Sequence, residues 1–578
     1  MQRAKLQYRE RRVGYFQLAL AGVTVIWALY RMSRFSRVDL LILVPVSVFV
    51  VFAAVHGRLQ RAVAKCSRSI LFYERGLARL DGSWAGTGVT GERFLEPSHP
   101  CARDLDLFGR GSIFELLCTA RTRAGEEALA RWLLAPAPPD EIRARQAAAI
   151  ELRDRVAFRE SLFITGEDLE LGVRPTHLIE WGEAEAILPG GMIRIAAPVL
   201  AAVWIGNFLA WFFWHAPGFL LLASTIINLV VSHRFRMHLD QAVHAAEEAG
   251  HDLSLLSQLL AVFEQENFIS PWLLQLQAQL RRPGTLPSRA IARLNRLVEY
   301  LESAHNLFVR IFDPMIFYRL QFALAAEVWR RRFGPSLRLW LESVGELEAL
   351  AALAGYTYER PEDVFPEFVD RAPCFEAVAL AHPLIPRERA VGNDLCLDDN
   401  LQLMIVSGPN MAGKSTFLRG IGVNTVLAQT GAPVRAASLN LSPLAVTASI
   451  CVLDSLEGGI SRFYAEIHRL KQIMDLTRGA VPVLFLLDEL LSGTNSHDRL
   501  IGTRSFVTSL VERGAVGLVT THDLALTAIP EGIGAQAVNC HFEDHLEDGQ
   551  LCFDYKLYPG VVQTSNALPL MRSIGLEV

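Results

Sequence analysis

The chain has 578 residues, enough for several domains and a large core. Its formal net charge of −5 gives the whole chain no electrostatic attraction to a polyanion. The eight cysteines show no C-x-x-C spacing, which argues against a zinc site or a disulfide framework. Hydrophobic residues make up 51% and the mean hydropathy is +0.24, which is high for a purely soluble protein.

The first source of this apolarity is a pair of runs near the N-terminus. Residues 13–30 contain no charged residue and no proline, and residues 38–55 contain only Asp39. Each run reaches the ~17–20 residues that cross a hydrocarbon core, so we predict a transmembrane hairpin within a domain of residues 1–60. A cleaved signal peptide is the alternative, but the first run continues well past the Ala19-Leu20-Ala21 triplet.

Residues 61–190 have a mainly helical pattern and form the predicted core region. Within them, Leu107–Leu134 has apolar residues at three- to four-residue spacing, which predicts a helix. That helix should end at the proline-rich residues 135–139.

A second apolar block, Ile195–Val231, is broken only by the turn-like residues 215–218. We predict a second transmembrane hairpin in a domain of residues 191–235, which brings the total to about four membrane helices. A buried helical hairpin of a soluble domain is the alternative. The basic residues that flank the first hairpin favour a multi-pass protein of the cell membrane with its large domains in the cytoplasm, although three arginines in the connecting loop weaken this orientation.

Residues 236–370 are again helical and form a predicted lever region. Between Arg281 and Arg338 there are eleven arginines and four acidic residues, a local net charge of about +7. Such an arm could neutralise DNA phosphates without recognising bases. The alternatives are an ordinary solvated face and a surface attracted to anionic lipid headgroups.

From residue 371 to residue 578, short apolar strands alternate with glycine turns and helices, an α/β pattern. The stretch Gly408–Ser415 matches the phosphate-loop pattern G-x-x-x-x-G-K-[ST] and follows the apolar run Leu401–Val406. Such loops turn backbone N–H groups towards phosphate, so we expect ATP and Mg²⁺ as cofactors, with Lys414 on the β- and γ-phosphates and Ser415 on the metal. The predicted nucleotide-binding residues are Gly408, Pro409, Asn410, Met411, Ala412, Gly413, Lys414, Ser415 and Thr416.

Two later strands supply further candidates. The apolar run 483–487 ends in Asp488, predicted to hold Mg²⁺, and Glu489, predicted to polarise the attacking water. Helix capping by both acids is the alternative. The strand 516–519 leads to His522, a candidate sensor of the γ-phosphate. The predicted catalytic residues are therefore Lys414, Glu489 and His522.

With these motifs in place, the chain resembles the MutS family of DNA mismatch-repair ATPases. The loop GPNMAGKST differs from the family pattern in having alanine rather than glycine at Ala412. Further stretches similar to family motifs occur in the same order as in the family, and a weaker similarity extends over residues 104–146. The stronger stretches are His382–Ile385, Val391–Asp394, Gly431–Ala436, Ser461–Glu466, Asp488–Asp498 and Tyr555–Gly560.

The resemblance implies an ABC-type, Mg-dependent ATPase that works as a homodimer, with Ser461 reaching in trans to the nucleotide of the other subunit. It also implies ATP-dependent DNA binding related to mismatch repair or recombination. The family reads mismatches with Phe-x-Glu in a globular domain; Phe72-Tyr73-Glu74 and Phe365-Pro366-Glu367 fit the tripeptide, but neither has such a domain around it. The alternative function is an ATPase that remodels a membrane component or membrane protein complex without DNA.

Overall fold

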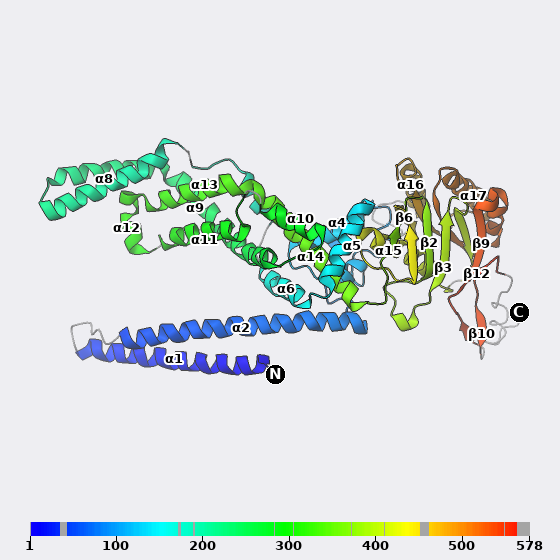
Figure 1. The fold of residues 1–578 in the computed structure, drawn as a ribbon, viewed down its shortest axis with the longest axis horizontal. Coiled ribbons are helices and arrows are strands. Elements are labelled where there is room, and N and C mark those ends of the chain that lie inside the picture. Colours follow the sequence, from blue (N-terminus) through cyan, green and yellow to red (C-terminus); the bar gives the residue numbers. More distant parts are fainter. Residues whose placement is uncertain are drawn as a thin grey trace.

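The computed structural model describes residues 2–34, 43–170, 175–188, 191–281, 284–304, 306–371, 373–409, 411–450, 462–547 and 550–562. The molecule is elongated, with an α/β domain at one end, a helical arm in the middle and two helical hairpins directed towards the other end (Figure 1). This arrangement confirms the predicted multidomain organisation, mostly helical with an α/β domain at the C-terminal side.

The N-terminal hairpin consists of α1 (Gln2–Arg34) and α2 (Leu43–Asp81). Its second helix does not end near residue 60, where the predicted hairpin domain stops. Because Gly57 is the only glycine in α2 before its last turns and α2 has no proline beyond Pro45, the helix continues as one rod from its apolar start into a polar half.

The polar half of α2 is fixed to the helical core. Arg79 donates two hydrogen bonds to Glu359, at 2.7 and 2.5 Å, and both side chains are largely buried. The ring of Phe72 packs against Phe163, with 5.4 Å between the centroids. Phe72 therefore serves in packing between helices, as expected for a chance occurrence of the Phe-x-Glu tripeptide.

The second hairpin consists of α8 (Met192–Trp214) and α9 (Gly218–Gln265), joined by a turn in which His215 has a φ of 52°. Among the described residues, only these two helices are long and apolar enough to cross a membrane, so the predicted number of four is not supported. Most of their apolar surface is not covered by the rest of the chain, and Phe213 and Trp214 are 63% and 76% exposed. The chain therefore does not bury this hairpin as a soluble core hairpin would be buried.

The helical core and arm lie between the hairpins and the α/β domain. α9 runs unbroken from the apolar hairpin into the arm, across the predicted boundary at residue 235. The other helices of this part are α3 (Ile113–Leu117), α4 (Arg123–Leu134), α5 (Pro139–Arg153), α6 (Val156–Glu170), α7 (Pro175–Glu183), α10 (Pro271–Leu280), α11 (Pro287–Ser303), α12 (Leu307–Ile316), α13 (Tyr318–Phe333) and α14 (Leu337–Glu359).

The helix predicted over Leu107–Leu134 is wrong in its first half. Gly109 and Gly111 have φ values of 110° and 74°, which a continuing right-handed helix cannot contain. The helix that begins at Arg123 is capped by Thr122, whose hydroxyl accepts a hydrogen bond from the N–H of Gly125 at 3.0 Å. It ends before the prolines, as predicted.

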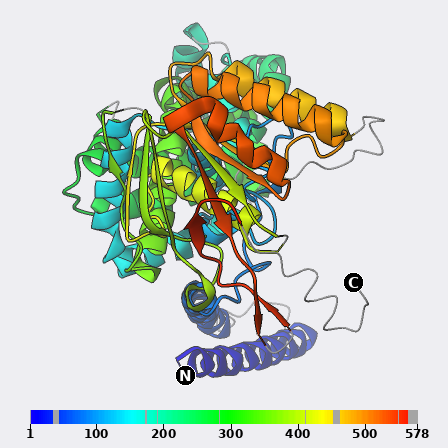
Figure 2. The same cartoon turned by 90° about the vertical axis from the view of Figure 1, so that its right-hand side faces the viewer.

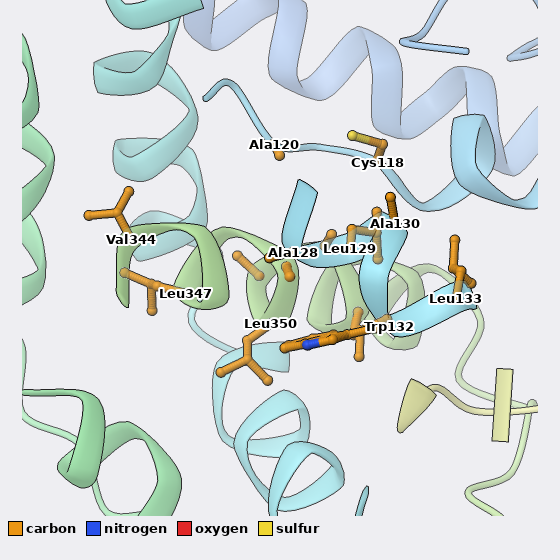
Figure 3. Packing of buried hydrophobic residues seen from close by; sticks show 14 of the residues in the cluster. Cys118, Ala120, Ala128, Leu129, Ala130, Trp132, Leu133, Val344, Leu347 and Leu350 are labelled. Carbon is orange, nitrogen blue, oxygen red and sulfur yellow. The ribbon is translucent and has the colours of Figure 1, made fainter. Parts of the chain in front are cut away.

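α14 is the central helix of the core and packs along α4 (Figure 3). Leu350 lies beside the α4 side chain Trp132, and both are buried. The two helices approach closely at Gly345, where an added Cβ would lie 2.5 Å from the carbonyl oxygen of Ala124. A residue with a side chain there would push the helices apart.

This interface also contains a buried carboxyl group, Glu348. It accepts hydrogen bonds from the backbone N–H of Arg121 at 3.0 Å and from the hydroxyl of Thr122. Burial has the largest effect on the Glu348 carboxyl group and raises its pKa to about 7, while these hydrogen bonds lower the pKa. Since the folded chain holds the proton more tightly than the unfolded chain, folding stability should fall as pH rises from about 4.5 to 7.

We expect Glu348→Gln, which mimics the protonated group, to remove this pH dependence. The wild-type chain should lose on the order of 3 kcal/mol of stability between pH 4.5 and pH 8 at this site, since one pKa unit corresponds to ~1.4 kcal/mol. Thermal unfolding at both pH values measures the difference, and Glu342→Gln, an exposed position on the same helix, is the control. Equal pH dependence in wild type and Glu348→Gln would contradict the assignment.

The α/β domain is built on a six-stranded sheet of order β12-β9-β4-β8-β7-β6, in which only the β9–β12 pair is antiparallel (Figure 2). A four-stranded sheet of order β1-β5-β2-β3 lies next to it, and β10 (His545–Glu547) pairs with β11 (Gln550–Cys552). The helices of this domain are α15 (Lys414–Thr430), α16 (Arg462–Leu476), α17 (Ser496–Glu512) and α18 (Ile529–Ile533). The remaining strands are β1 (Glu367–Phe368), β2 (Cys374–Leu380), β3 (Asn393–Asp398), β4 (Leu403–Ser407), β5 (Ser438–Leu441), β6 (Ala445–Ser449), β7 (Val483–Asp488), β8 (Val516–Thr521), β9 (Ala537–Phe542) and β12 (Leu557–Pro559).

Candidate nucleotide site

The site forms where the parallel strands β4, β7 and β8 end at the same edge of the sheet. β4 is fully buried and leads into the loop 408–413, and α15 begins at Lys414. Gly408 and Gly413 have φ values of 143° and 97°. A Cβ on Gly408 would lie 2.7 Å from the carbonyl oxygen of Phe542, so this position requires glycine for space as well as for conformation.

Lys414 lies at the first turn of α15 with its side chain turned back into the loop. Its Nζ donates hydrogen bonds to the carbonyl oxygens of Gly408 at 2.9 Å and Pro409 at 2.8 Å. Burial lowers the pKa of this ammonium group, and the nearby carboxylates of Glu489 and Asp488 oppose that shift. A partly desolvated cation at a helix N-terminus is suited to hold phosphate oxygens.

Ser415 and Asp488 meet across the loop. The hydroxyl of Ser415 donates to Oδ2 of Asp488 at 2.5 Å, and Oδ1 of Asp488 accepts from the hydroxyl of Thr520. A hydroxyl and a carboxylate side by side are the hard oxygen ligands that Mg²⁺ prefers, and the predicted phosphate loop lies next to them. These residues therefore fit the predicted metal.

Glu489 follows Asp488 in the left-handed conformation, with a φ of 49°. Its backbone N–H donates to the carbonyl oxygen of Thr520 at 3.1 Å, which fixes this unusual turn to the end of β8. Its Oε1 lies 3.0 Å from Nδ1 of His522. The structure thus places two of the three candidate catalytic residues, Glu489 and His522, in contact.

A cavity of about 600 Å³ adjoins Lys414, Ser415 and Glu489, whereas the predicted residues Gly408, Pro409, Asp488 and His522 do not line it. Met411, Gly413, Lys414, Ser415, Thr416 and Glu489 line it, together with Phe417, Gly420 and Phe542. Ala412, the departure from the family pattern, is buried in the loop without lining the cavity. Two predicted residues, Asn410 and Ser461, lie outside the described residues.

The wall opposite the phosphate loop was not predicted from the sequence. The segment between β2 and β3 contributes His382, Ile385 and Arg389, and the segment before β12 contributes Tyr555. Three stretches that resemble family motifs, His382–Ile385, Val391–Asp394 and Tyr555–Gly560, contribute to this wall, but no role was assigned to them from the sequence. Burial, together with the positive charges of Arg419 and Arg435, lowers the pKa of His382 to about 4. The His382 imidazole is therefore neutral near pH 7.

Residues 404–577 match the family model described as MutS domain V. The C-terminal domain belongs to the MutS family. The MutS resemblance of the phosphate loop and of the motifs around it is thereby confirmed, and the relatives by name include both mismatch-repair proteins and an endonuclease.

Three MutS relatives illustrate the extent of the match. Endonuclease MutS2 of Thermus thermophilus is 34% identical over 238 residues, which is 41% of this chain and 30% of the relative. DNA mismatch repair protein MutS of Exiguobacterium sp. is 32% identical over 252 residues, 42% of this chain and 28% of the relative. DNA mismatch repair protein MutS 2 of Haloarcula marismortui is 36% identical over 199 residues, 34% of this chain and 20% of the relative. The chain therefore spans less than a third of the length of each.

Proposed function

We propose that this chain is a membrane-anchored, MutS-like ATPase that hydrolyses ATP with Mg²⁺ and uses the cycle to bind DNA. The observation that carries the proposal is the cavity in which the phosphate loop, Ser415 and Glu489 converge, within a MutS-type domain. The MutS relatives support an ATP-dependent function related to DNA.

Each residue has a defined part in hydrolysis. Lys414 and the N-terminal N–H groups of α15 hold the phosphates and stabilise negative charge that develops on them. Ser415 and Asp488 would hold Mg²⁺, which would supply neutralisation of phosphate charge. Glu489 orients and polarises the attacking water, and His522 keeps the Glu489 carboxylate in place through their 3.0 Å contact.

A homodimeric, ABC-type arrangement belongs to the same proposal. In it, two α/β domains enclose ATP between the phosphate loop of one subunit and the Ser461 segment of the other. The similarity of residues 461–466 to the family signature motif supports this arrangement, and the MutS-type domain is consistent with it.

Anchoring in the cell membrane is supported by the α8–α9 hairpin. The tip of α8–α9 carries exposed aromatic residues, and Arg194, Arg234 and Arg236 lie at the opposite, arm-side end of the apolar segments. In the first hairpin, Arg58, Arg61 and Lys65 likewise follow the apolar part of α2 towards the core. Basic residues on the side of the α/β domain favour a cytoplasmic location for that domain.

The DNA contact is assigned to α11. Of the arginines in the arm, Arg319 is paired with Asp313, and Arg330 is buried against Glu327. On α11, by contrast, Arg289, Arg293 and Arg296 are exposed along one stripe, at a spacing of four and three residues. A stripe of this kind can contact consecutive phosphates without reading bases.

A second candidate function has an observation of its own. The arm ends in the apolar α8–α9 hairpin. If the arm moves, this hairpin moves with it, and the hairpin would be embedded in lipid. On this alternative, the ATPase acts on a membrane component or membrane protein complex and needs no DNA.

The ATPase rate of the full chain in lipid nanodiscs, with and without homoduplex, mismatched and branched DNA, separates the two candidates. On the DNA candidate, DNA stimulates hydrolysis, and the triple variant Arg289→Gln/Arg293→Gln/Arg296→Gln loses the stimulation. The slope of log affinity against log salt should then become less steep by ~3, one unit for each lost phosphate contact.

The matched control replaces three arginines elsewhere, the exposed Arg478 and Arg513 and the half-buried Arg153, and should keep the stimulation. An ATPase rate that no DNA changes would contradict DNA as the partner and favour the membrane candidate. Extraction with alkaline carbonate tests membrane anchoring separately. If carbonate releases the chain from membranes, the chain is not an integral membrane protein.

A further inference from the structure

The segment that follows α2 crosses the α/β domain before it enters α3. The backbone N–H of Ala448 donates to the carbonyl oxygen of Pro100 at 3.0 Å, at the end of β6. Leu105 is fully buried against α15, and a Cβ on Gly422 would lie only 2.6 Å from its Cδ2. Asp106 is paired with Arg419, on the second turn of α15, at 3.0 Å. This connector, residues 100–106, is therefore firmly attached to the helix that begins at the phosphate loop.

Asp104 lies at the centre of the connector and is 2% exposed. Its Oδ1 accepts a hydrogen bond from the backbone N–H of Ile450 at 2.8 Å. Its Oδ2 lies 3.5 Å from the guanidinium of Arg469 on α16, which also donates to the carbonyl oxygen of His99 at 2.9 Å. A buried carboxylate with a charged partner holds its geometry tightly, because moving it away would leave both charges uncompensated.

α16 in turn contacts the turn that carries Glu489. Glu466, one turn before Arg469, is buried, and its Oε1 accepts a hydrogen bond from the backbone N–H of Leu491 at 2.6 Å. Leu491 and Glu489 both have left-handed φ values, 53° and 49°. Two such residues in one short turn are kept in place only by surrounding contacts, and the Glu466 bond is one of them.

We propose that Asp104 is a positioning residue for hydrolysis: through Arg469 and the Glu466 end of α16, it sets the place of Glu489 relative to the phosphate loop. The connector contacts α15 and α16 together, so it fixes the distance between the helix that starts at the phosphates and the turn that carries the water-polarising acid. Because the connector continues from α2, the same contacts link the catalytic turn to the N-terminal hairpin. The inference rests on the proposed ATPase.

The test compares the turnover number with the affinity for nucleotide in Asp104→Asn. The asparagine keeps the shape and the acceptor for the Ile450 N–H but loses the charge that holds Arg469. We expect kcat to fall on the order of 10-fold, because a displacement well under 1 Å at a catalytic group is costly. The dissociation constant for a fluorescent ATP analogue should stay within about twofold, because Lys414 and Ser415 are untouched.

Arg469→Gln should have the same effect, and the double variant should be no slower than the slower single variant, because both act through one contact. Asp140→Asn is the matched control: it also removes an aspartate paired with an arginine, but an exposed one, and should leave kcat unchanged.

An unchanged kcat in Asp104→Asn would overturn the proposal. The proposal would also be overturned if the affinity for nucleotide fell as much as kcat did. The same holds if the double variant lost the product of the two single losses. Both results describe a general loss of structure. The outcome for the ATPase itself is separate. If Lys414→Ala retained hydrolysis, the proposed activity would fail, whereas a Lys414-dependent ATPase with a normal Asp104→Asn variant would overturn only the role of Asp104.

Discussion

Lys414→Ala is expected to abolish ATP hydrolysis and to weaken nucleotide binding by on the order of 100-fold. The ammonium group is buried at the start of α15, and its only described hydrogen-bond acceptors are the carbonyl oxygens of Gly408 and Pro409. Alanine removes the ammonium group from the phosphate loop and leaves the helix N-terminus and the proposed Mg²⁺ to compensate the charge of a triphosphate. Steady-state phosphate release and binding of a fluorescent ATP analogue measure the two effects.

The matched control is Lys471→Ala, an exposed lysine on α16 of the same domain. It removes the same charge and should leave both rate and affinity unchanged. The far-ultraviolet circular dichroism of both variants should match that of the wild type, because the alanine at 414 is a good helix former at a first turn. Hydrolysis by Lys414→Ala at a rate within a few fold of the wild type would contradict the assignment of the site.

The parts of the site that could be predicted from the sequence are those at the ends of buried strands. β4, β7 and β8 read as apolar runs, and the groups that follow them, Lys414, Asp488 and His522, come together because parallel strands present their carboxyl ends at one edge of the sheet. The spacing of the motifs along the chain does not show how far apart they lie in space. The parallel arrangement of the strands does, because it brings the motif residues to one edge.

The opposite wall of the cavity could not be found in this way. Ile385 and Arg389 come from the segment between β2 and β3 of the neighbouring sheet, and Tyr555 comes from the segment before β12. Their approach to the phosphate loop depends on how the two sheets pack, which no local pattern encodes. The helix predicted over Leu107–Leu134 is interrupted by a local feature, the two left-handed glycines Gly109 and Gly111. The prediction missed the interruption because it followed the helical spacing of the apolar residues.

The hairpins show a further limit. Hydropathy located the apolar runs, but it did not show that α2 and α9 continue through the predicted boundaries at 60 and 235 as single helices. Such a helix carries a displacement of its polar half directly into its apolar half, since an α-helix of this length is stiff. The predicted membrane and lever domains are therefore mechanically coupled through α2 and α9, and the predicted boundaries did not show this coupling.

Glu489→Gln is expected to lower hydrolysis by at least ~100-fold while nucleotide binding stays within about twofold of the wild type. Glutamine has the same shape and can keep a hydrogen bond to His522, but it cannot accept a proton from water. The groups that hold the phosphates do not change, because Lys414 bonds to the loop carbonyls and Ser415 bonds to Asp488. Single-turnover hydrolysis and analogue binding separate chemistry from affinity.

Glu512→Gln, at the exposed end of α17, removes the same charge from the same domain and serves as the control, with rate and affinity expected to match the wild type. The opposite pattern, weaker binding with hydrolysis per bound nucleotide preserved, would show that Glu489 holds the nucleotide and does not act on water. That result would move the search for the catalytic base to His522, which is half exposed and whose Nδ1 lies 3.0 Å from the carboxylate. Because the left-handed turn at Glu489 is held by its backbone bond to Thr520, the substitution should not move the turn, and the measured loss reports on the carboxylate itself.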